Sequence, residues 1–66
     1  MRKIIAKSNS NNEALVFTKL NKMWDRVRYQ NGDIVCWGRV KEATMQKELA
    51  TIEEFGPAEG WTITRM

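Results

Sequence analysis

The dipeptide Asn31-Gly32 constrains the fold of this chain more than any other pair of residues. It stands between two runs rich in aromatic and β-branched residues, MWDRVRYQ and DIVCWGRV. Asn-Gly favours the two-residue turn of a β-hairpin, because both central positions of that turn need a positive φ. The sequence therefore predicts a hairpin over residues 23–40, closed at 31–32.

A two-residue turn also determines which residues of the hairpin face each other. Counting back from the turn on a regular ladder pairs Gln30 with Asp33, Arg28 with Val35, Arg26 with Trp37, and Trp24 with Arg39. Because side chains alternate between the faces of a strand, these residues are expected to share one surface.

The two faces of the predicted hairpin differ in chemistry. The aliphatic face is expected to be core and carries Met23, Val27, Tyr29, Ile34, Cys36 and Val40. The other face carries the candidate partner-binding residues Trp24, Arg26, Arg28, Trp37 and Arg39. Trp and Arg are enriched in interface hot spots, which favours a binding surface. Two alternatives stay open: a self-contained ladder of cation–π pairs across the strands, or burial of the indoles under the N-terminal segment.

Residues 41–57, KEATMQKELATIEEFGP, have the periodicity of an amphipathic helix. Its apolar stripe consists of Met45, Leu49, Ile52 and Phe55. Thr44 is a candidate N-cap, and the Gly-Pro pair at 56–57 is a stop signal. This helix is expected to lie on the aliphatic face of the hairpin.

The segments at 2–7 and 60–66 are short and rich in β-branched residues, so both are predicted as strands. Residues 12–22 fit either a helix or a strand, and the alternation of Leu15 and Phe17 favours a strand that turns at 21–22. The predicted fold class is α+β: an antiparallel sheet of about four to five strands with one amphipathic helix packed on one face. The C-terminal half has the order hairpin, helix, strand, and residues 1–66 form a single small domain.

The composition argues against an enzyme, a metal site and a cofactor. The 66 residues include no His and one Cys, whereas catalysis needs a positioned base, nucleophile or metal. A structural zinc site would lack soft ligands. Cys36 falls on the expected core face, where a thiol packs as a small hydrophobe. We expect a non-enzymatic protein without a cofactor.

The apolar runs are far shorter than the ~20 residues that span a bilayer. The N-terminal stretch MRKIIAKSNS has no sustained apolar region of the kind that signal peptides contain. An unpaired thiol and the lack of an export signal favour a cytoplasmic location, which is the host cytoplasm if the chain is phage-encoded. No membrane partner is expected.

Charge is divided unevenly along the chain. Residues 1–41 contain nine Lys or Arg and three Asp or Glu, whereas residues 42–66 contain two and five. This asymmetry favours an anionic partner for the first part. Solubilising surface charge is the simpler interpretation.

From residue 33 onwards, the order DIVCWGRVKEAT…ELATIEEFGPAEGWTITRM resembles the family of the small coliphage inhibitor of bacterial RNA polymerase. That family has two strands, an amphipathic helix, a Pro-Ala-Gly-like break and a strand of the form aromatic-x-aliphatic-Thr-Arg. Here the break is PAEG at 57–60 and the strand is WTITR at 61–65. The resemblance implies that Arg65 contacts an acidic region of the polymerase large subunit.

Three functions follow as hypotheses. The first is a small non-enzymatic protein-binding module, a phage or mobile-element inhibitor that docks on a host protein or protein–nucleic-acid complex such as RNA polymerase or a CRISPR-type effector. The second is a basic domain that binds DNA or RNA directly with its Arg/Trp sheet face; the pattern W-x₆-NG-x₅-G at 24–38 is similar to sheet domains of phage integrases. The third is a structural protein that completes its core by self-association, and both a monomer and a homodimer remain open.

Overall fold

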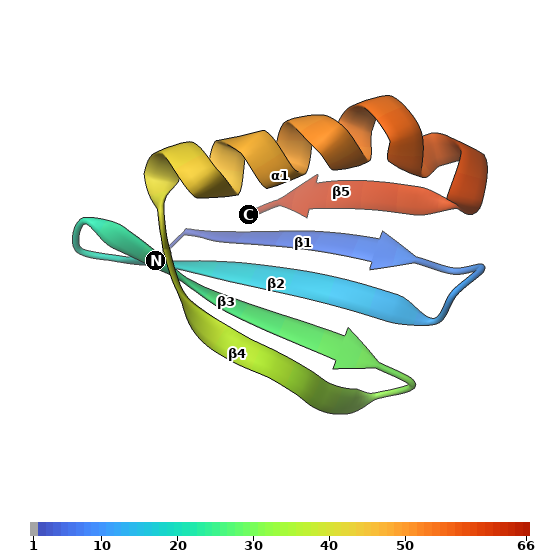
Figure 1. The fold of residues 1–66 in the computed structure, drawn as a ribbon, viewed down its shortest axis with the longest axis horizontal. Coiled ribbons are helices and arrows are strands. Elements are labelled where there is room, and N and C mark those ends of the chain that lie inside the picture. The colour runs from blue at the N-terminus through green and yellow to red at the C-terminus, as the bar shows by residue number, and fades with distance from the viewer. Residues whose placement is uncertain (1) are drawn as a thin grey trace.

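The computed structural model describes residues 2–66, which form a five-stranded antiparallel sheet and one helix. The elements are β1 (Lys3–Ser8), β2 (Glu13–Leu20), β3 (Met23–Gln30), β4 (Asp33–Lys41), α1 (Glu42–Phe55), the 3-10 turn η1 (Gly56–Glu59) and β5 (Trp61–Arg65). The strand order is β4-β3-β2-β1-β5. Helix α1 runs along one face of the sheet beside β5 and β1 (Figure 1). The predicted α+β fold is confirmed.

Asparagines with positive φ form the tight turns. Asn31 and Gly32 have φ of 54° and 86°, so the predicted Asn-Gly turn is confirmed. Asn21, with φ of 26°, starts the two-residue turn between β2 and β3, so residues 13–20 form a strand as the alternation indicated. Asparagine tolerates this left-handed region better than most residues, which is why three of these positions are Asn.

The hydrophobic core lies between α1 and the sheet face that the helix covers. Its buried members are Ile4, Ala6, Leu15, Phe17, Trp24, Met45 and Leu49. The strand residues share one face because Ile4 pairs with Phe17 and Ala6 pairs with Leu15 across β1 and β2. Burying each large apolar side chain contributes about 1.5–3 kcal/mol. The core is small, as expected for a chain of this length.

The helix boundaries differ from the prediction at both ends. α1 begins at Glu42 after Lys41, so Thr44 is not its N-cap. At the other end Phe55 is 66% exposed instead of completing the apolar stripe. The stop at Gly56 is confirmed, because α1 ends there and the chain tightens into η1. A Cβ at Gly56 would lie 2.8 Å from Cβ of Trp61, so this close approach requires glycine.

The pairing of β3 with β4 departs from the regular ladder that the turn predicted. Gln30 pairs with Asp33 and Tyr29 with Ile34, but the next pair is Arg28 with Cys36. Val35 is therefore an extra residue, a β-bulge. A shift of one residue moves every later side chain to the opposite face of its strand. Beyond the bulge the predicted register is wrong.

The bulge overturns the predicted assignment of faces. Trp24 pairs with Val40 and not with Arg39, and Trp37 pairs with Val27 and not with Arg26. The helix packs on the face that carries Trp24, Arg26 and Arg28, so the β3 residues expected to be core, Met23, Val27 and Tyr29, lie on the opposite face. On β4 the bulge places Val40 on the helix side, where it packs against the core, and places Trp37 and Arg39 on the opposite face. Cys36 pairs with Arg28 on the helix side but is exposed instead of buried. No helix formed by residues 2–66 has the length and apolar content that crossing a membrane requires.

Candidate binding surface on the open sheet face

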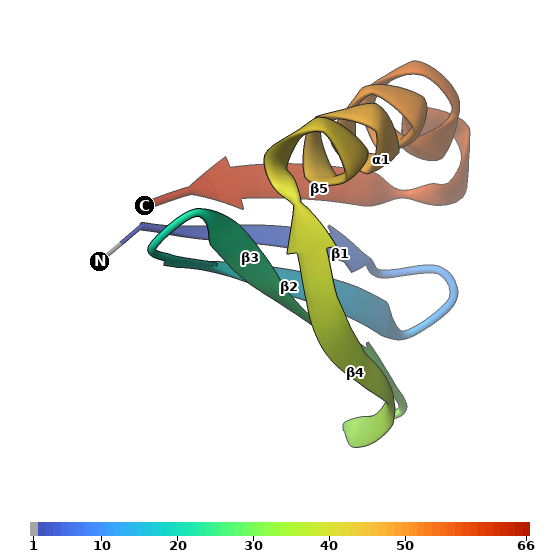
Figure 2. The ribbon, with the colours of Figure 1, turned by 60° about the vertical axis from the view of Figure 1, so that its left-hand side comes forward.

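The sheet face opposite α1, hereafter the open face, carries a row of paired residues that is apolar on four of the five strands. Within residues 2–66 no helix covers this face (Figures 1 and 2). The row crosses the five strands through the paired residues Thr64, Ile5, Val16, Val27 and Trp37. Trp37 ends the row on β4 and is 68% exposed. Such a large exposed aromatic on an edge strand is available to a partner.

Cations surround this row. The register places four on the open face, Lys3, Lys7, Arg39 and Lys41, against the single carboxylate of Asp25. Nε of Arg39 donates to Oδ1 of Asp25 at 3.2 Å, and its side chain is 64% exposed. Within residues 2–66 the three lysines form no ion pair. The open face therefore combines apolar area with uncompensated positive charge.

Glutamates of the helix pair with strand cations on the helix side of the sheet. Residues 42–59 carry five Glu and one Lys, and three of these carboxylates pair with cations of the sheet. The pairs join Lys19 to Glu42, Arg26 to Glu48 and Arg65 to Glu53, at 3.0, 2.7 and 2.7 Å. The two faces of the sheet therefore differ: each strand cation on the helix side is paired with a glutamate, whereas Lys3, Lys7 and Lys41 on the open face form no ion pair within residues 2–66.

Trp24 and Arg26 hold α1 on the sheet. The indole Nε1 of Trp24 donates to Oε1 of Glu42 at 2.9 Å. Nε and NH2 of Arg26 donate to the two carboxylate oxygens of Glu48 at 2.7 and 2.8 Å. This bidentate pair raises the pKa of Arg26, chiefly through the hydrogen bond to Glu48. Both side chains therefore have structural roles.

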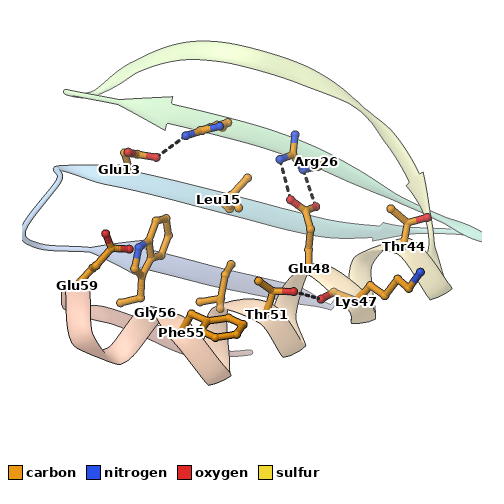
Figure 3. A pocket seen from close by; sticks show the side chains of 13 residues that line it. Glu13, Leu15, Arg26, Thr44, Lys47, Glu48, Thr51, Phe55, Gly56 and Glu59 are labelled. Atoms are coloured by element: carbon orange, nitrogen blue, oxygen red, sulfur yellow. Dashed lines mark hydrogen bonds and ion pairs between the residues drawn. The ribbon is translucent and has the colours of Figure 1, made fainter.

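A groove of about 610 Å³ opens between α1 and the sheet on the helix side (Figure 3). Its apolar lining comes from Leu15, Ile52, Phe55 and Trp61. Two ion pairs flank it, Arg26 with Glu48 and Arg28 with Glu13. These two ion pairs are satisfied within the protein, and the remaining charged residues of the lining, Lys47 and Glu59, have opposite signs, so the groove has no net charge that selects a ligand.

The predicted partner-binding residues do not form one surface. Trp37 and Arg39 lie on the open face, two residues apart on β4. Trp24 is only 2% exposed and cannot contact a partner. Arg26 and Arg28 are on the helix side, already paired with carboxylates. The predicted common patch is wrong because the bulge places Trp37 and Arg39 of β4 on the face opposite Trp24, Arg26 and Arg28 of β3.

Arg65 lies on β5, at the edge of the sheet opposite β4, and its NH2 meets Oε1 of Glu53 at 2.7 Å. Both side chains are more than half exposed. Trp61 is half-buried and packs against the core. Arg65 is thus accessible, but it is not adjacent to Trp37 and Arg39.

The sequence interpretation missed the contribution of β1 to the open face. Lys3, Ile5 and Lys7 alternate with Ile4, Ala6 and Ser8, and only the second set faces the helix. This period of two is visible in the sequence and would have placed both lysines on one face. Ser8, fully buried, donates through Oγ to the carbonyl of Glu59 at 2.9 Å, a contact that no local pattern indicates.

No protein-family model, no curated protein and no solved structure matches this chain.

Proposed function

We propose that the protein is a small non-enzymatic protein-binding module, encoded by a phage or mobile element, that docks on a host nucleic-acid machine. Its open face is the docking surface, and an acidic protein surface is the occupant. The observation that carries this proposal is the difference between the two faces. Each strand cation on the helix side is paired with a glutamate, whereas Lys3, Lys7 and Lys41 on the open face are not paired within residues 2–66.

The chemistry of the open face suits such a partner. Protein interfaces have an apolar centre with a polar rim, and here the row from Ile5 to Trp37 lies between cations. Complementary charge speeds the encounter and rejects wrong partners. An acidic surface gains most from docking here, because no internal pair of the lysines must break first.

RNA polymerase is the first machine to test, because residues 57–65 resemble the end of the coliphage inhibitor. A CRISPR-type effector is the second. The exposed pair between Arg65 and Glu53 is worth about 0–1 kcal/mol. Arg65 can therefore exchange Glu53 for a carboxylate of the partner at little cost.

The experiment measures binding of the purified protein to purified bacterial RNA polymerase, together with inhibition of transcription. Lys3→Gln/Lys7→Gln removes two cations of the open face and is expected to weaken binding about tenfold. Lys22→Gln/Lys47→Gln is the matched control, since it removes two cations from the β2–β3 turn and from α1. An equal loss in both variants contradicts docking by the open face. The absence of a complex removes the polymerase as the target, and the same pair of variants is then applied to a CRISPR effector.

A second function, direct binding of single-stranded nucleic acid, is favoured by the 68% exposure of Trp37 among cations. Bases stack on such an aromatic while cations contact the phosphates. Fluorescence anisotropy with mixed-sequence single strands tests this function. The logarithm of the binding constant is expected to fall with the logarithm of the salt concentration, with a slope of about −0.7 per phosphate contact. No binding at low salt excludes this function and leaves the protein-binding proposal standing.

A further inference from the structure

Strand β4 has an unpaired outer edge. It is the last strand of the sheet and pairs only with β3. Within residues 2–66, no backbone hydrogen bond from a turn, loop or other segment reaches it. In Figure 2 β4 lies at the front, and its N-terminal half extends away from α1. After the bulge, residues 36–41 continue as regular strand, with their outer backbone groups available.

This edge is apolar to an unusual degree for an exposed strand. Ile34, Val35 and Trp37 are 61%, 55% and 68% exposed. Proteins normally protect long edges with charges, covering elements or very short strands. Here the bulge protects the end near the turn, and the regular segment from Cys36 onwards carries Arg39 and Lys41 but, in the part of the chain that the structure describes, no covering element, so it remains a template for a strand that can accommodate these cations.

We propose that a second copy of this chain pairs with this edge, β4 against β4 and antiparallel, about a twofold axis at Gly38. The two sheets then form one continuous sheet of ten strands, five from each copy. In this register Trp37 lies opposite the partner's Arg39, and both side chains belong to the open face. Cys36 lies opposite the partner's Val40 on the helix side.

The charges of the facing residues and the lack of a side chain at Gly38 favour this register over registers shifted along the strand. Arg39 of one copy lies beside the indole of Trp37 in the other, which is a favourable cation–π contact, and the twofold axis repeats this contact on its other side. Gly38 offers no side chain at the axis, and a Cβ built there meets nothing within 4 Å. Pairing about Arg39 would place two guanidiniums opposite each other, which is unfavourable. Pairing about Trp37 would leave only residues 36–38 in regular pairs before the bulge at Val35, whereas pairing about Gly38 leaves residues 36–40.

Self-association extends the proposed function without depending on it. The open faces of the two copies become one surface, because paired strands continue the same sheet. That surface carries both Trp37 side chains near its centre and the free lysines of both copies. The dimer can be measured without any partner, so its failure and the failure of polymerase binding are separate results.

The first experiment is sedimentation velocity of the full chain across a concentration series, with two variants of one residue. Trp37→Glu places a carboxylate opposite the partner's Arg39 and is expected to retain the dimer. Trp37→Lys places two cations opposite each other and is expected to weaken the dimer by about tenfold or more. Because both variants remove the indole, non-specific apolar association would be lost equally in both. A wild type that stays monomeric at every concentration, or an equal loss in both variants, overturns the proposal.

The second experiment tests the register with the single native cysteine. Directly opposite residues of antiparallel strands have Cα atoms about 4.5–5.5 Å apart, within the range of a disulfide. Val40→Cys is therefore expected to form a covalent dimer under mild oxidation, through Cys36 of one copy and the thiol introduced at position 40 of the other. Val40→Cys/Cys36→Ala and the wild type are expected to cross-link much more slowly. Cross-linking that is equally fast in all three contradicts pairing about Gly38.

Discussion

Trp24 on β3 and Glu42 on α1 are joined by a hydrogen bond of 2.9 Å from the indole Nε1 to the carboxylate Oε1. Nζ of Lys19 approaches the same oxygen at 3.0 Å and lies 5.2 Å from the centre of the indole ring. Together these contacts lower the pKa of Glu42 to about 2, with the indole hydrogen bond as the largest cause. The first residue of the helix is thereby attached to the middle of the sheet.

The ionised form of Glu42 is expected to stabilise the fold. The pKa of Glu42 is depressed in the folded protein from an unfolded value of about 4.3. The contribution of Glu42 to the stability of the fold is therefore complete above the unfolded pKa and is lost as the pH falls towards about 2. Glu42→Gln is expected to unfold more easily at neutral pH and to show a smaller decline in stability in acid. Urea unfolding at a series of pH values measures both effects. Glu54→Gln, on the exposed side of α1, is the control; an unchanged acid decline in Glu42→Gln would contradict this role.

Arg26 is expected to stabilise the fold and not to contact a partner. Its side chain and that of Glu48 are 21% and 31% exposed, and their bidentate geometry is good. Arg26→Gln is expected to lower the free energy of unfolding by about 1–2 kcal/mol, because it leaves a half-buried carboxylate without its donors. Arg39→Gln, at a 64% exposed side chain, is expected to change it by less than about 0.5 kcal/mol. Equal effects of the two changes would refute this distinction.

The two tryptophans of the hairpin are expected to behave in opposite ways. Trp24 is 2% exposed and Trp37 is 68% exposed. Trp24→Ala leaves a large cavity and is expected to cost about 3–5 kcal/mol, which can unfold so small a domain, so Trp24→Leu is a milder second variant. Trp37→Ala is expected to change the stability of the dilute protein by less than about 0.5 kcal/mol and to impair binding. Thermal unfolding measures the first effect and the polymerase assay the second. A destabilised Trp37→Ala would mean that this indole supports the fold.

The elements of the fold follow from signals within a few residues of the sequence. The composition of each sheet face depends instead on the bulge at Val35, which no such local signal marks. Asn31-Gly32, the period of α1 and the β-branched runs each identify their element, because turn geometry and apolar periodicity act over a few residues. The sequence DIVCW contains no glycine or proline to mark a bulge. The bulge at Val35 shifts β4 by one residue against β3, so that Val40 and not Arg39 lies beside the buried Trp24. Which face of the hairpin is buried depends on packing against α1, and the hairpin sequence alone carries no information about that packing.

Deleting Val35 tests whether the bulge or the packing decides which face is buried. Without it, Tyr29–Ile34 and Arg28–Cys36 become consecutive pairs of a regular ladder, and every later pair keeps its present partner. We therefore expect the deletion variant to fold with Trp24 buried and to retain cross-strand nuclear Overhauser contacts between Val27 and Trp37. Val35→Gly is the matched control, since it keeps the chain length and removes only the side chain. Contacts of Trp37 with α1 in the deletion variant would mean that the bulge residue itself, and not the burial of Trp24, directs the faces of β4.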